Sequence, residues 1–412
     1  MTYPEAIEWL YGTQLFGIKL GLENSHRLLQ ELEAEKPSPA TRIVHVAGTN
    51  GKGSVCAMLD AMLRAGGART GLFTSPHLVS FRERIRVNGG TIAEDEVASG
   101  LSEIRARVEA WEIHPTFFEI TLGLAMRHFK RERCQALVIE TGMGGRLDAT
   151  NALASDVAVI TPIGLDHTQW LGKTHTAVAV EKAGIIKPGK PVVSALQVPE
   201  AAAVIEVAAR REGAPLHLAG RTLPENWTVA LTGPHQRQNA ALAVAAARLL
   251  WPEISESAIE TGLATVKWPA RFQRIGERFV IDGAHNAHAA AVLAETWRAT
   301  FPAGEKATVI FGGVATKDTS EVLSLLGDFA GRWIFVKVAS QRGLPAENLL
   351  KTWNSLSRPG IPAETAPSMT EALARAEAVA EADPILVTGS LYLAGEAIAQ
   401  LQGGPPFEPS EQ

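Results

Sequence analysis

The chain has 412 residues, of which 46% are hydrophobic and 20% are charged, so it can bury a large core and is not an intrinsically disordered protein. At roughly 150 residues per domain, this length predicts two or three domains. A formal net charge of −5 argues against a general nucleic-acid-binding protein, and the two cysteines, Cys56 and Cys134, exclude a disulfide scaffold and a cysteine-rich zinc domain.

The sequence gives no sign of a membrane segment or a signal peptide. No apolar run approaches the roughly 20 residues that span a bilayer. Residues Met1–Trp9 lack the basic and apolar regions of a signal peptide. We therefore expect a cytoplasmic protein without a membrane partner. The last residues, Gly403–Gln412, are rich in Gly, Pro and Glu and predict a frayed tail.

Short β-branched segments alternate with longer segments of helical periodicity along nearly the whole chain. The predicted strands are Arg42–Ala47, Ala136–Glu140, Val157–Thr161, Pro191–Ser194, Thr308–Phe311, Trp333–Val338 and Ile385–Thr388. The predicted helices include Ser54–Ala65, Phe117–Lys130, Pro199–Arg211 and Asn239–Leu250. This alternation is typical of βαβ units and predicts an α/β fold with mainly parallel sheets.

A domain boundary is predicted where Trp268-Pro269 interrupts the pattern after a helix. Residues 1–267 then form one large α/β domain, residues 268–272 a linker, and residues 273–412 a second, smaller α/β domain. The second domain restarts the alternation with two short apolar segments, Phe272–Ile275 and Phe279–Ile281.

The strongest local signal is the segment Gly48-Thr49-Asn50-Gly51-Lys52-Gly53-Ser54, which follows a predicted strand and opens a predicted helix. Backbone N–H groups in such a turn, together with the helix N-terminus, form an anion cradle for phosphates. The strict phosphate-loop pattern G-x-x-x-x-G-K-[ST] is not met, because the first Gly is replaced by Val46 and Lys52 is followed by Gly53. We interpret the segment as a variant phosphate loop; the alternative is a Gly-rich turn with an incidental Lys.

Polar residues follow two further predicted strands. Glu140 ends one strand and precedes a Gly-rich segment, and Asp166-His167 follows the next. Ligands of α/β sheets bind at the carboxyl ends of the strands, where a carboxylate can hold Mg²⁺. From the residues alone, Glu140 is equally well a strand-end carboxylate with no metal, and His167 a solvated side chain. In the second half, Asp282 ends a strand and His285-Asn286 opens a helix, which taken alone indicates a helix N-cap.

Taken together, these motifs resemble the ATP-dependent amide ligases of the murein-ligase superfamily, and within it the folylpolyglutamate synthase/dihydrofolate synthase family. The resemblance runs from about Leu10 to Tyr392. The matching segments are Gly48–Ser54, Thr74–Leu78, Glu83–Gly89, Thr116–Glu119, Glu140–Asn151, Leu165–His167, Glu181–Gly184, Trp268–Arg271 and Asp282–Asn286. One departure is Ala270, where the family often has Gly.

The resemblance implies a P-loop ATPase-like N-terminal domain, a Rossmann-like C-terminal glutamate-ligase domain and a monomer. It implies ATP-binding residues Gly48, Thr49, Asn50, Gly51, Lys52, Gly53, Ser54, Asn239, Arg271 and Asp282. It implies Mg²⁺ ligands Ser54, Ser75, Glu140, His167 and Lys182, the last as a carbamate that helps place a second ion. Lys52, His167, Lys182 and His285 are the implied catalytic residues. The implied pterin site comprises Gly17, Ile18, Lys19, Leu20, Thr116, Phe117, Phe118, Glu119, Leu147, Asp148 and Ala149.

The expected reaction adds L-glutamate to dihydropteroate, to the glutamate tail of tetrahydrofolate, or to both. ATP phosphorylates the carboxylate, the amine attacks the acyl phosphate, and ADP and phosphate leave. Such transfer needs positioning and charge neutralisation, which Lys52, backbone amides and one or two Mg²⁺ ions supply. Because Arg271 lies in the expected linker and Asp282 in the second domain, we also hypothesise that the domains close around ATP.

Three alternatives stay open at this point. A monofunctional folylpolyglutamate synthase would extend folates only. A murein-precursor ligase is disfavoured because only 47 residues precede Gly48, too few for a nucleotide-sugar domain. A nucleotide-dependent regulator without ligase activity would use the phosphate loop, but would not need Glu140, His167 and Lys182 together.

Overall fold

The structure is a computed structural model that describes residues 1–16, 21–219, 223–315, 319–340, 342–356, 358, 360–380, 383–403 and 407–408. The chain divides into two compact units. The N-terminal unit comprises residues 1–75, 82–230 and 237–266, and the C-terminal unit comprises residues 76–81, 231–236 and 267–412. Among the described residues, no helix is both long and apolar enough to span a membrane.

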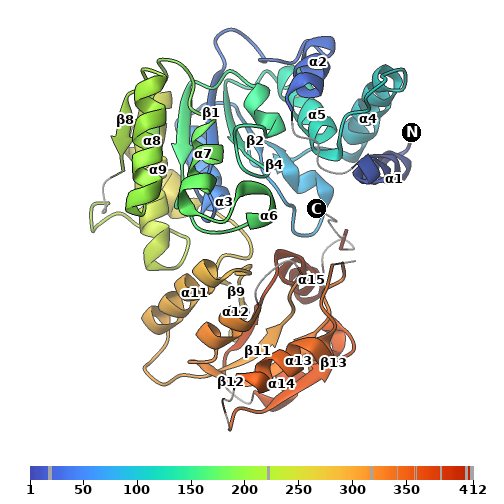
Figure 1. Ribbon diagram of the computed structural model, residues 1–412, viewed down its shortest axis with the longest axis vertical. Coiled ribbons are helices and arrows are strands. Elements are labelled where there is room, and N and C mark those ends of the chain that lie inside the picture. The colour runs from blue at the N-terminus through green and yellow to red at the C-terminus, as the bar shows by residue number, and fades with distance from the viewer. Residues whose placement is uncertain are drawn as a thin grey trace. The chain divides into compact units, whose positions relative to one another are not determined.

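The N-terminal unit is built on an eight-stranded sheet of described residues with the order β4-β3-β2-β5-β1-β6-β7-β8 (Figure 1). The strands are β1 (Arg42–Ala47), β2 (Thr70–Phe73), β3 (Ile85–Val87), β4 (Gly90–Thr91), β5 (Ala136–Glu140), β6 (Val157–Ile160), β7 (Val192–Ser194) and β8 (Leu216–Leu218). The pairs from β2 to β8 are parallel, and only β3 and β4 add antiparallel pairs at one edge. The central strand β1 lies between β5 and β6, so the three predicted site strands are neighbours.

Helices cover both faces of this sheet. They are α1 (Tyr3–Gly12), α2 (Glu23–Glu31), α3 (Lys52–Ala65), α4 (Glu94–Val108), α5 (Phe117–Arg131), α6 (Thr168–Leu171), α7 (His175–Ala183), α8 (Pro199–Arg211), α9 (Pro234–Leu250) and α10 (Glu256–Thr265). Short 3-10 helices span Thr13–Phe16, Phe81–Arg84 and Ala149–Ala152. Helix α3 packs on β1, β2 and β5 and carries α10 on its outer side, while α5 and α7 lie on the opposite face (Figure 1).

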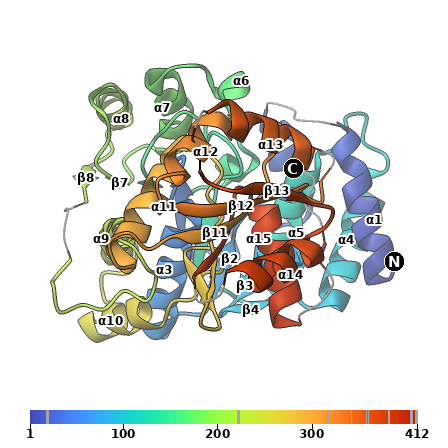
Figure 2. The ribbon, with the colours of Figure 1, turned by 90° about the horizontal axis from the view of Figure 1, so that it is seen from below.

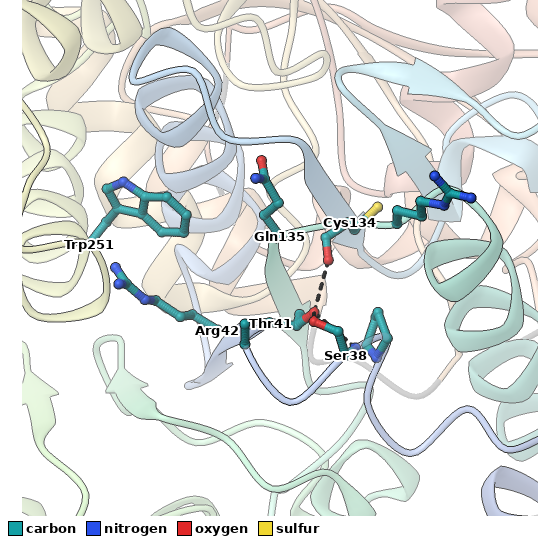
Figure 3. A pocket seen from close by; sticks show the side chains of 9 residues that line it. Ser38, Thr41, Arg42, Cys134, Gln135 and Trp251 are labelled. Atoms are coloured by element: carbon teal, nitrogen blue, oxygen red, sulfur yellow. Dashed lines mark hydrogen bonds between the residues drawn. The ribbon is translucent and has the colours of Figure 1, made fainter.

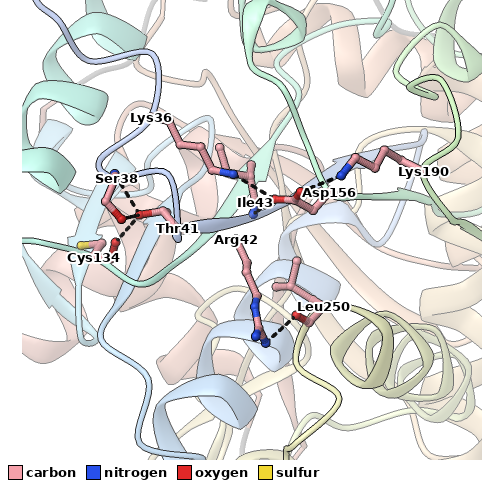
Figure 4. Close-up of polar contacts among 9 residues, drawn as sticks. All are labelled: Lys36, Ser38, Thr41, Arg42, Ile43, Cys134, Asp156, Lys190 and Leu250. Carbon is pink, nitrogen blue, oxygen red and sulfur yellow. Dashed lines mark hydrogen bonds and ion pairs between the residues drawn. The ribbon is translucent and has the colours of Figure 1, made fainter.

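The amino ends of the central strands are tied together by polar contacts (Figure 4). Asp156, just before β6, accepts a hydrogen bond from the backbone N–H of Ile43 at 3.0 Å and pairs with Lys36 and Lys190. The Thr41 hydroxyl donates to the carbonyl oxygen of Cys134 at 3.0 Å, which joins the segments that precede β1 and β5. These contacts fix the register of the strands at the edge opposite to the phosphate loop.

The C-terminal unit contains a six-stranded sheet of described residues with the order β13-β12-β11-β14-β10-β9. Its strands are β9 (Gln273–Ile275), β10 (Phe279–Ile281), β11 (Ala307–Phe311), β12 (Ala330–Val336), β13 (Ala363–Ala366) and β14 (Ile385–Thr388), and only β9 is antiparallel. Its helices are α11 (Ala287–Thr300), α12 (Thr319–Leu326), α13 (Ala346–Ser355), α14 (Met369–Val379) and α15 (Leu391–Gln402). Figure 2 shows α12 and α13 on one side of this sheet and α14 and α15 on the other, in agreement with two separate apolar clusters.

The expectation of a wholly frayed tail is wrong for two residues near the chain end. The backbone N–H of Glu408 donates to the carbonyl oxygen of Val79 at 2.8 Å. The carboxylate of Glu408 accepts a hydrogen bond from the backbone N–H of Phe81 at 2.7 Å and another from the Ser80 hydroxyl at 3.3 Å. Phe407 also approaches Gly395 on α15. Composition could not reveal this contact, because its partners lie more than 300 residues away in the sequence.

The α/β class and the predominance of parallel strands are confirmed, and most predicted elements match the observed ones within two residues. Strand β12 starts three residues earlier than predicted and ends two residues earlier. Asn286 is the N-cap of α11 as expected, since its side chain accepts a hydrogen bond from the backbone N–H of Ala289.

Candidate active site

The segment after β1 folds as a phosphate loop despite its departure from the strict pattern. Gly48 and Gly51 adopt φ values of 149° and 89°, a backbone region that side chains with a Cβ rarely adopt. Helix α3 begins at Lys52, directly after Gly51, so its N-terminal N–H groups face the turn. The turn therefore has the backbone geometry of an anion cradle.

Neighbouring segments crowd this loop and fix its shape. A Cβ on Gly48 would lie 1.8 Å from Thr161 Oγ1, and one on Gly51 would lie 2.7 Å from Asn239 Oδ1. The Thr49 hydroxyl accepts a hydrogen bond from the backbone N–H of Gly164 at 3.0 Å and donates one to the carbonyl oxygen of Gly164 at 2.9 Å. The structure thus brings the predicted ATP residue Asn239, on α9, directly beside the loop.

Lys182 on α7 is the most unusual charged residue of the site. Its side chain is 4% exposed, and its Nζ donates a hydrogen bond to the carbonyl oxygen of Gly48 at 2.8 Å. Burial, and secondly the nearby charge of Lys52, lowers the pKa of Lys182 to about 7, although Asp166 acts in the opposite direction. A lysine in this setting is partly neutral at physiological pH and can act as a nucleophile.

Glu140, the last residue of β5, is 4% exposed and lies at the same sheet edge. Its Oε2 accepts a hydrogen bond from the backbone N–H of Ser75 at 3.2 Å. The structure thus brings together two of the predicted Mg²⁺ ligands. Among the residues that the structure describes, no group of three or more His, Cys, Asp or Glu side chains is placed to hold a metal ion.

His167 lies in a strained position at the start of α6. It adopts φ +49° and ψ +37°, and its backbone N–H donates to Asp166 Oδ1 at 2.7 Å. The His167 side chain is about half exposed, whereas that of Asp166 is 10% exposed. A left-handed conformation at a non-Gly residue persists only where the surrounding structure holds it in place.

The segment after β5 forms a closed loop over residues Thr141–Asn151. Asp148 accepts hydrogen bonds from the backbone N–H groups of Met143 and Thr150 at 2.9 and 3.0 Å. Burial raises the pKa of Asp148 above its ordinary value, and these hydrogen bonds oppose the shift. Asn151 donates to the carbonyl oxygens of Arg146 and Gly184, which fastens the loop to the segment after α7. The predicted pterin residues Leu147–Ala149 are therefore held on a fixed loop.

The second predicted pterin segment, Thr116–Glu119, is the capped start of α5. The backbone N–H of Thr116 donates to Glu119 Oε2 at 2.7 Å, and Ser25 donates to Glu119 Oε1 at 3.4 Å. Phe118 is half-buried and closely approaches Gly142, at the start of the loop after β5. The two segments therefore lie side by side. The third predicted segment, Gly17–Leu20, lies outside the described residues.

The C-terminal unit gathers the remaining predicted residues. Asp282 accepts hydrogen bonds from the backbone N–H groups of Phe272 and Ala284 at 2.8 and 2.9 Å. Burial raises the pKa of Asp282, while the charge of Arg271 acts in the opposite direction. His285 Nδ1 lies 2.8 Å from the carbonyl oxygen of Gly283. The nearby Ala270 adopts φ +56°, a backbone region that favours Gly over a residue with a Cβ.

A cavity of about 420 Å³ also lies in the N-terminal unit (Figure 3). It lies at the amino edge of the sheet, opposite to the phosphate loop. Its lining includes Thr41, Arg42 and Gln135, which precede or begin β1 and β5, together with Trp251. The Arg42 guanidinium stacks on the Trp251 ring at 4.4 Å and pairs with Glu253. Arg42, one of the two arginines in the lining, is thus already engaged within the protein.

Comparison with known proteins gives concordant matches. The Mur ligase middle domain family matches residues 46–214, and the Mur ligase glutamate ligase domain family matches residues 270–391. The dihydrofolate synthase/folylpolyglutamate synthase of Bacillus subtilis is 37% identical over 380 residues, covering 84% of this chain and 88% of that protein. The Escherichia coli protein of the same name is 35% identical over 393 residues, covering 91% of this chain and 90% of its own. The chain belongs to the dihydrofolate synthase/folylpolyglutamate synthase family.

Solved structures support the same assignment. E. coli FolC in complex with DHPP and ADP has a TM-score of 0.87 at 33% identity, covering 97% of this chain and 98% of that chain. The folylpolyglutamate synthase of Mycobacterium tuberculosis complexed with ADP has a TM-score of 0.88 at 28% identity. This family consists of ATP-dependent ligases, so the resemblance drawn from the motifs is confirmed. The alternatives of a murein-precursor ligase and a non-catalytic regulator are set aside.

Sequence reasoning overlooked some residues around the synthase site. Asp166 acts on the charge of Lys182 but was noticed only as the neighbour of His167. His45 and Thr150 form a buried hydrogen bond beneath the loop after β5. A signal existed for His45, because it is a polar residue inside an otherwise apolar strand.

Proposed function

We propose that this chain carries both activities of its family, adding L-glutamate to dihydropteroate and to the glutamate tail of tetrahydrofolates. One observation carries the proposal: the phosphate loop with Lys52, the buried Lys182 that bonds it, and the buried Glu140 lie at the carboxyl edge of one parallel sheet. Such an edge can hold an ATP γ-phosphate and an incoming carboxylate together. The match to bifunctional relatives over most of their length favours this proposal over a monofunctional enzyme.

In this proposal, Gly48–Ser54 bind the ATP phosphates through backbone N–H groups, and Lys52 neutralises negative charge during phosphoryl transfer. Asn239 lines the loop from α9. The acceptor carboxylate attacks the γ-phosphate and forms an acyl phosphate with release of ADP. The glutamate amine then attacks the acyl carbon, and phosphate leaves. Arg271, Asp282 and His285 are proposed to serve the same reaction from the C-terminal unit.

The residues fit a divalent cation. Glu140, Ser75, Ser54 and His167 would hold Mg²⁺, which when bound neutralises phosphate charge and polarises the transferring group. A relative from Yersinia pestis was solved with AMPPNP and a Mn ion, which supports a divalent cation here. The hydrogen bond from the Ser75 N–H to Glu140 would orient this carboxylate for the ion.

Lys182 is proposed to be N-carboxylated. The neutral amine attacks CO₂, a C–N bond forms and one proton is released, so a cation becomes an anionic oxygen ligand. Burial and a pKa of about 7 support this step, because only the neutral amine reacts. Labelling with ¹³C-bicarbonate should give one carbamate resonance in ¹³C NMR that is lost in Lys182→Met and kept in Lys190→Met. A resonance that survives Lys182→Met would reject the assignment.

The experiment for the whole proposal measures phosphate release from Mg-ATP and L-glutamate with either dihydropteroate or a tetrahydrofolate monoglutamate. We expect turnover with both acceptors, and none when glutamate is omitted. Turnover with only one acceptor would show a monofunctional enzyme. Turnover with neither, in a folded sample that binds ATP, would overturn the proposal. The cytoplasmic location and the monomeric state expected from the sequence stay predictions.

A further inference from the structure

A buried histidine sits in the central strand, below the phosphate loop. His45 is 1% exposed and lies between the fully buried side chains of Val44 and Val46 in β1. Its Nε2 is 2.8 Å from the hydroxyl of Thr150, which follows β5 and is itself fully buried. Burying an imidazole inside a sheet is unfavourable unless a partner compensates, and the Thr150 hydroxyl is that partner.

The direction of the hydrogen bonds follows from counting protons. The Thr150 hydroxyl has a single proton and donates it to Asp148 Oδ1. His45 Nε2 must therefore donate to the same hydroxyl, which leaves Nδ1 without a proton. Within the described part of the chain Nδ1 has no hydrogen-bond partner. Burial, and secondly the charge of Lys187, lowers the pKa of His45 to about 3, so the ring stays neutral at physiological pH.

This chain of hydrogen bonds closes the loop after β5 and anchors it. Asp148 joins the start of the loop, at the Met143 N–H, to its end, at the N–H and hydroxyl of Thr150. His45 then ties the closed loop to β1. The loop contains three glycines, at positions 142, 144 and 145, so its backbone would otherwise sample many conformations.

We propose that His45 and Thr150 are positioning residues for the acceptor. Acting through Asp148, they set the loop segment Leu147–Ala149 in place relative to the strand that leads into the phosphate loop. The inference rests on the proposed function and on the role that the family resemblance implies for this segment, contact with the pterin-bearing substrate. Neither residue is proposed to touch substrate. Loss of the hydrogen bond between His45 and Thr150 therefore weakens acceptor binding. ATP binding to the backbone N–H groups of Gly48–Ser54 is unaffected.

The test is the isosteric variant Thr150→Val. It keeps the side-chain volume but removes the hydroxyl that links His45 to Asp148. We expect the KM for dihydropteroate to rise about tenfold while the KM for ATP changes less than twofold. Thr150→Ser restores the hydroxyl and should return the acceptor KM to within about twofold of the wild type. His45→Leu, which breaks the chain from the other end, should reproduce the Thr150→Val effect.

A matched control separates positioning from general loss of stability. Thr41→Val removes another buried hydroxyl that donates to a backbone carbonyl, at the opposite edge of the same sheet (Figure 4). This variant should lower the melting temperature without changing the acceptor KM. An unchanged acceptor KM in folded Thr150→Val, an equal rise in Thr41→Val, or parallel rises for acceptor and ATP would overturn the inference. Wild-type protein without turnover would instead fail the proposed function, so the two failures are distinguishable.

Discussion

Charged side chains are buried at one edge of the eight-stranded sheet and partly exposed at the other. At the carboxyl edge, Lys182 and Glu140 are each only 4% exposed. At the amino edge, Asp156 and Lys190 keep 28% and 48% of their side chains exposed while they pair. Buried charges are unfavourable for folding, whereas half-exposed pairs cost little and contribute little. The comparison indicates that one edge is arranged for chemistry and the other for holding strands together.

The strongest test of this difference between the two edges is to replace one lysine at each edge. Lys182→Met should lower turnover by about 10²- to 10³-fold, because a buried group at the proposed reaction centre is lost. Lys190→Met should stay within about twofold of wild type. Steady-state phosphate release with saturating ATP and acceptor measures both. Similar losses in the two variants would contradict a functional difference between the edges.

The two acidic residues give the next largest contrast. Glu140→Gln should lower turnover by about tenfold to hundredfold and raise the Mg²⁺ concentration needed for half-maximal rate, because a proposed ligand loses its charge. Asp156→Asn should leave the Mg²⁺ dependence unchanged. Magnesium titrations at fixed ATP distinguish the two. A Glu140→Gln enzyme with normal Mg²⁺ dependence would remove this residue from the proposed metal site.

The buried lysine should also leave a signature in the pH dependence of stability. Its pKa falls from 10.5 to about 7 in the folded protein, so the unfolded chain binds more protons between these values. Since stability rises with pH wherever the unfolded state binds more protons, Lys182 makes the folded state more stable as pH rises from 7 toward 10. In buffer free of CO₂ and bicarbonate, where Lys182 stays an amine, denaturant unfolding measures the stability of wild type and Lys182→Met across this range. The stability of the wild type minus that of the variant should rise with pH, and a flat difference would mean that Lys182 titrates normally.

The smallest expected effect concerns the amino edge itself. Burial alone would raise the pKa of Asp156, but the Ile43 N–H and Lys190 outweigh it, and the pKa lies below its ordinary value. Asp156→Asn should therefore lower the free energy of unfolding by about 1 kcal/mol, with turnover unchanged within about twofold. Urea unfolding at pH 7 measures the loss. If the loss shrinks as the pH falls below 3.8, the ordinary pKa at which the carboxylate of the unfolded chain takes up its proton, the charge is its cause.

The sequence was most informative where chemistry and periodicity coincide. The strand β1 and the turn Gly48–Ser54 were predictable, because a β-branched run leads into glycines and a lysine. The strands β3 and β4 were missed, because segments of two or three residues with polar members show no periodicity. The apolar segment Phe272–Ile275 did predict β9, but not its antiparallel pairing with β10. Antiparallel pairing at a sheet edge arises from the tertiary structure rather than from local preference.

For the candidate site, the sequence identified the proposed binding residues but not the residues that hold them in place. Glu140 and Lys182 could be predicted because their motifs are specific. The hydrogen bond between His45 and Thr150 could not be predicted, since it joins residues 105 positions apart and depends on β1 pairing with β5. The burial of Lys182, which lowers its pKa, was equally invisible without the packing of α7.

The composition of the C-terminal unit from three separate chain segments has a consequence during protein synthesis. Leu78 and Val79 pack on the apolar cluster that includes Leu393 and Ala394 of α15. Gly395 approaches the backbone of Leu78 so closely that a Cβ there would lie 1.9 Å from its carbonyl oxygen. Residues near position 78 leave the ribosome first and must wait for α15, which is made near the end, before this core is complete. A fragment starting at residue 267 would lack Leu78 and Val79, which pack on this apolar cluster.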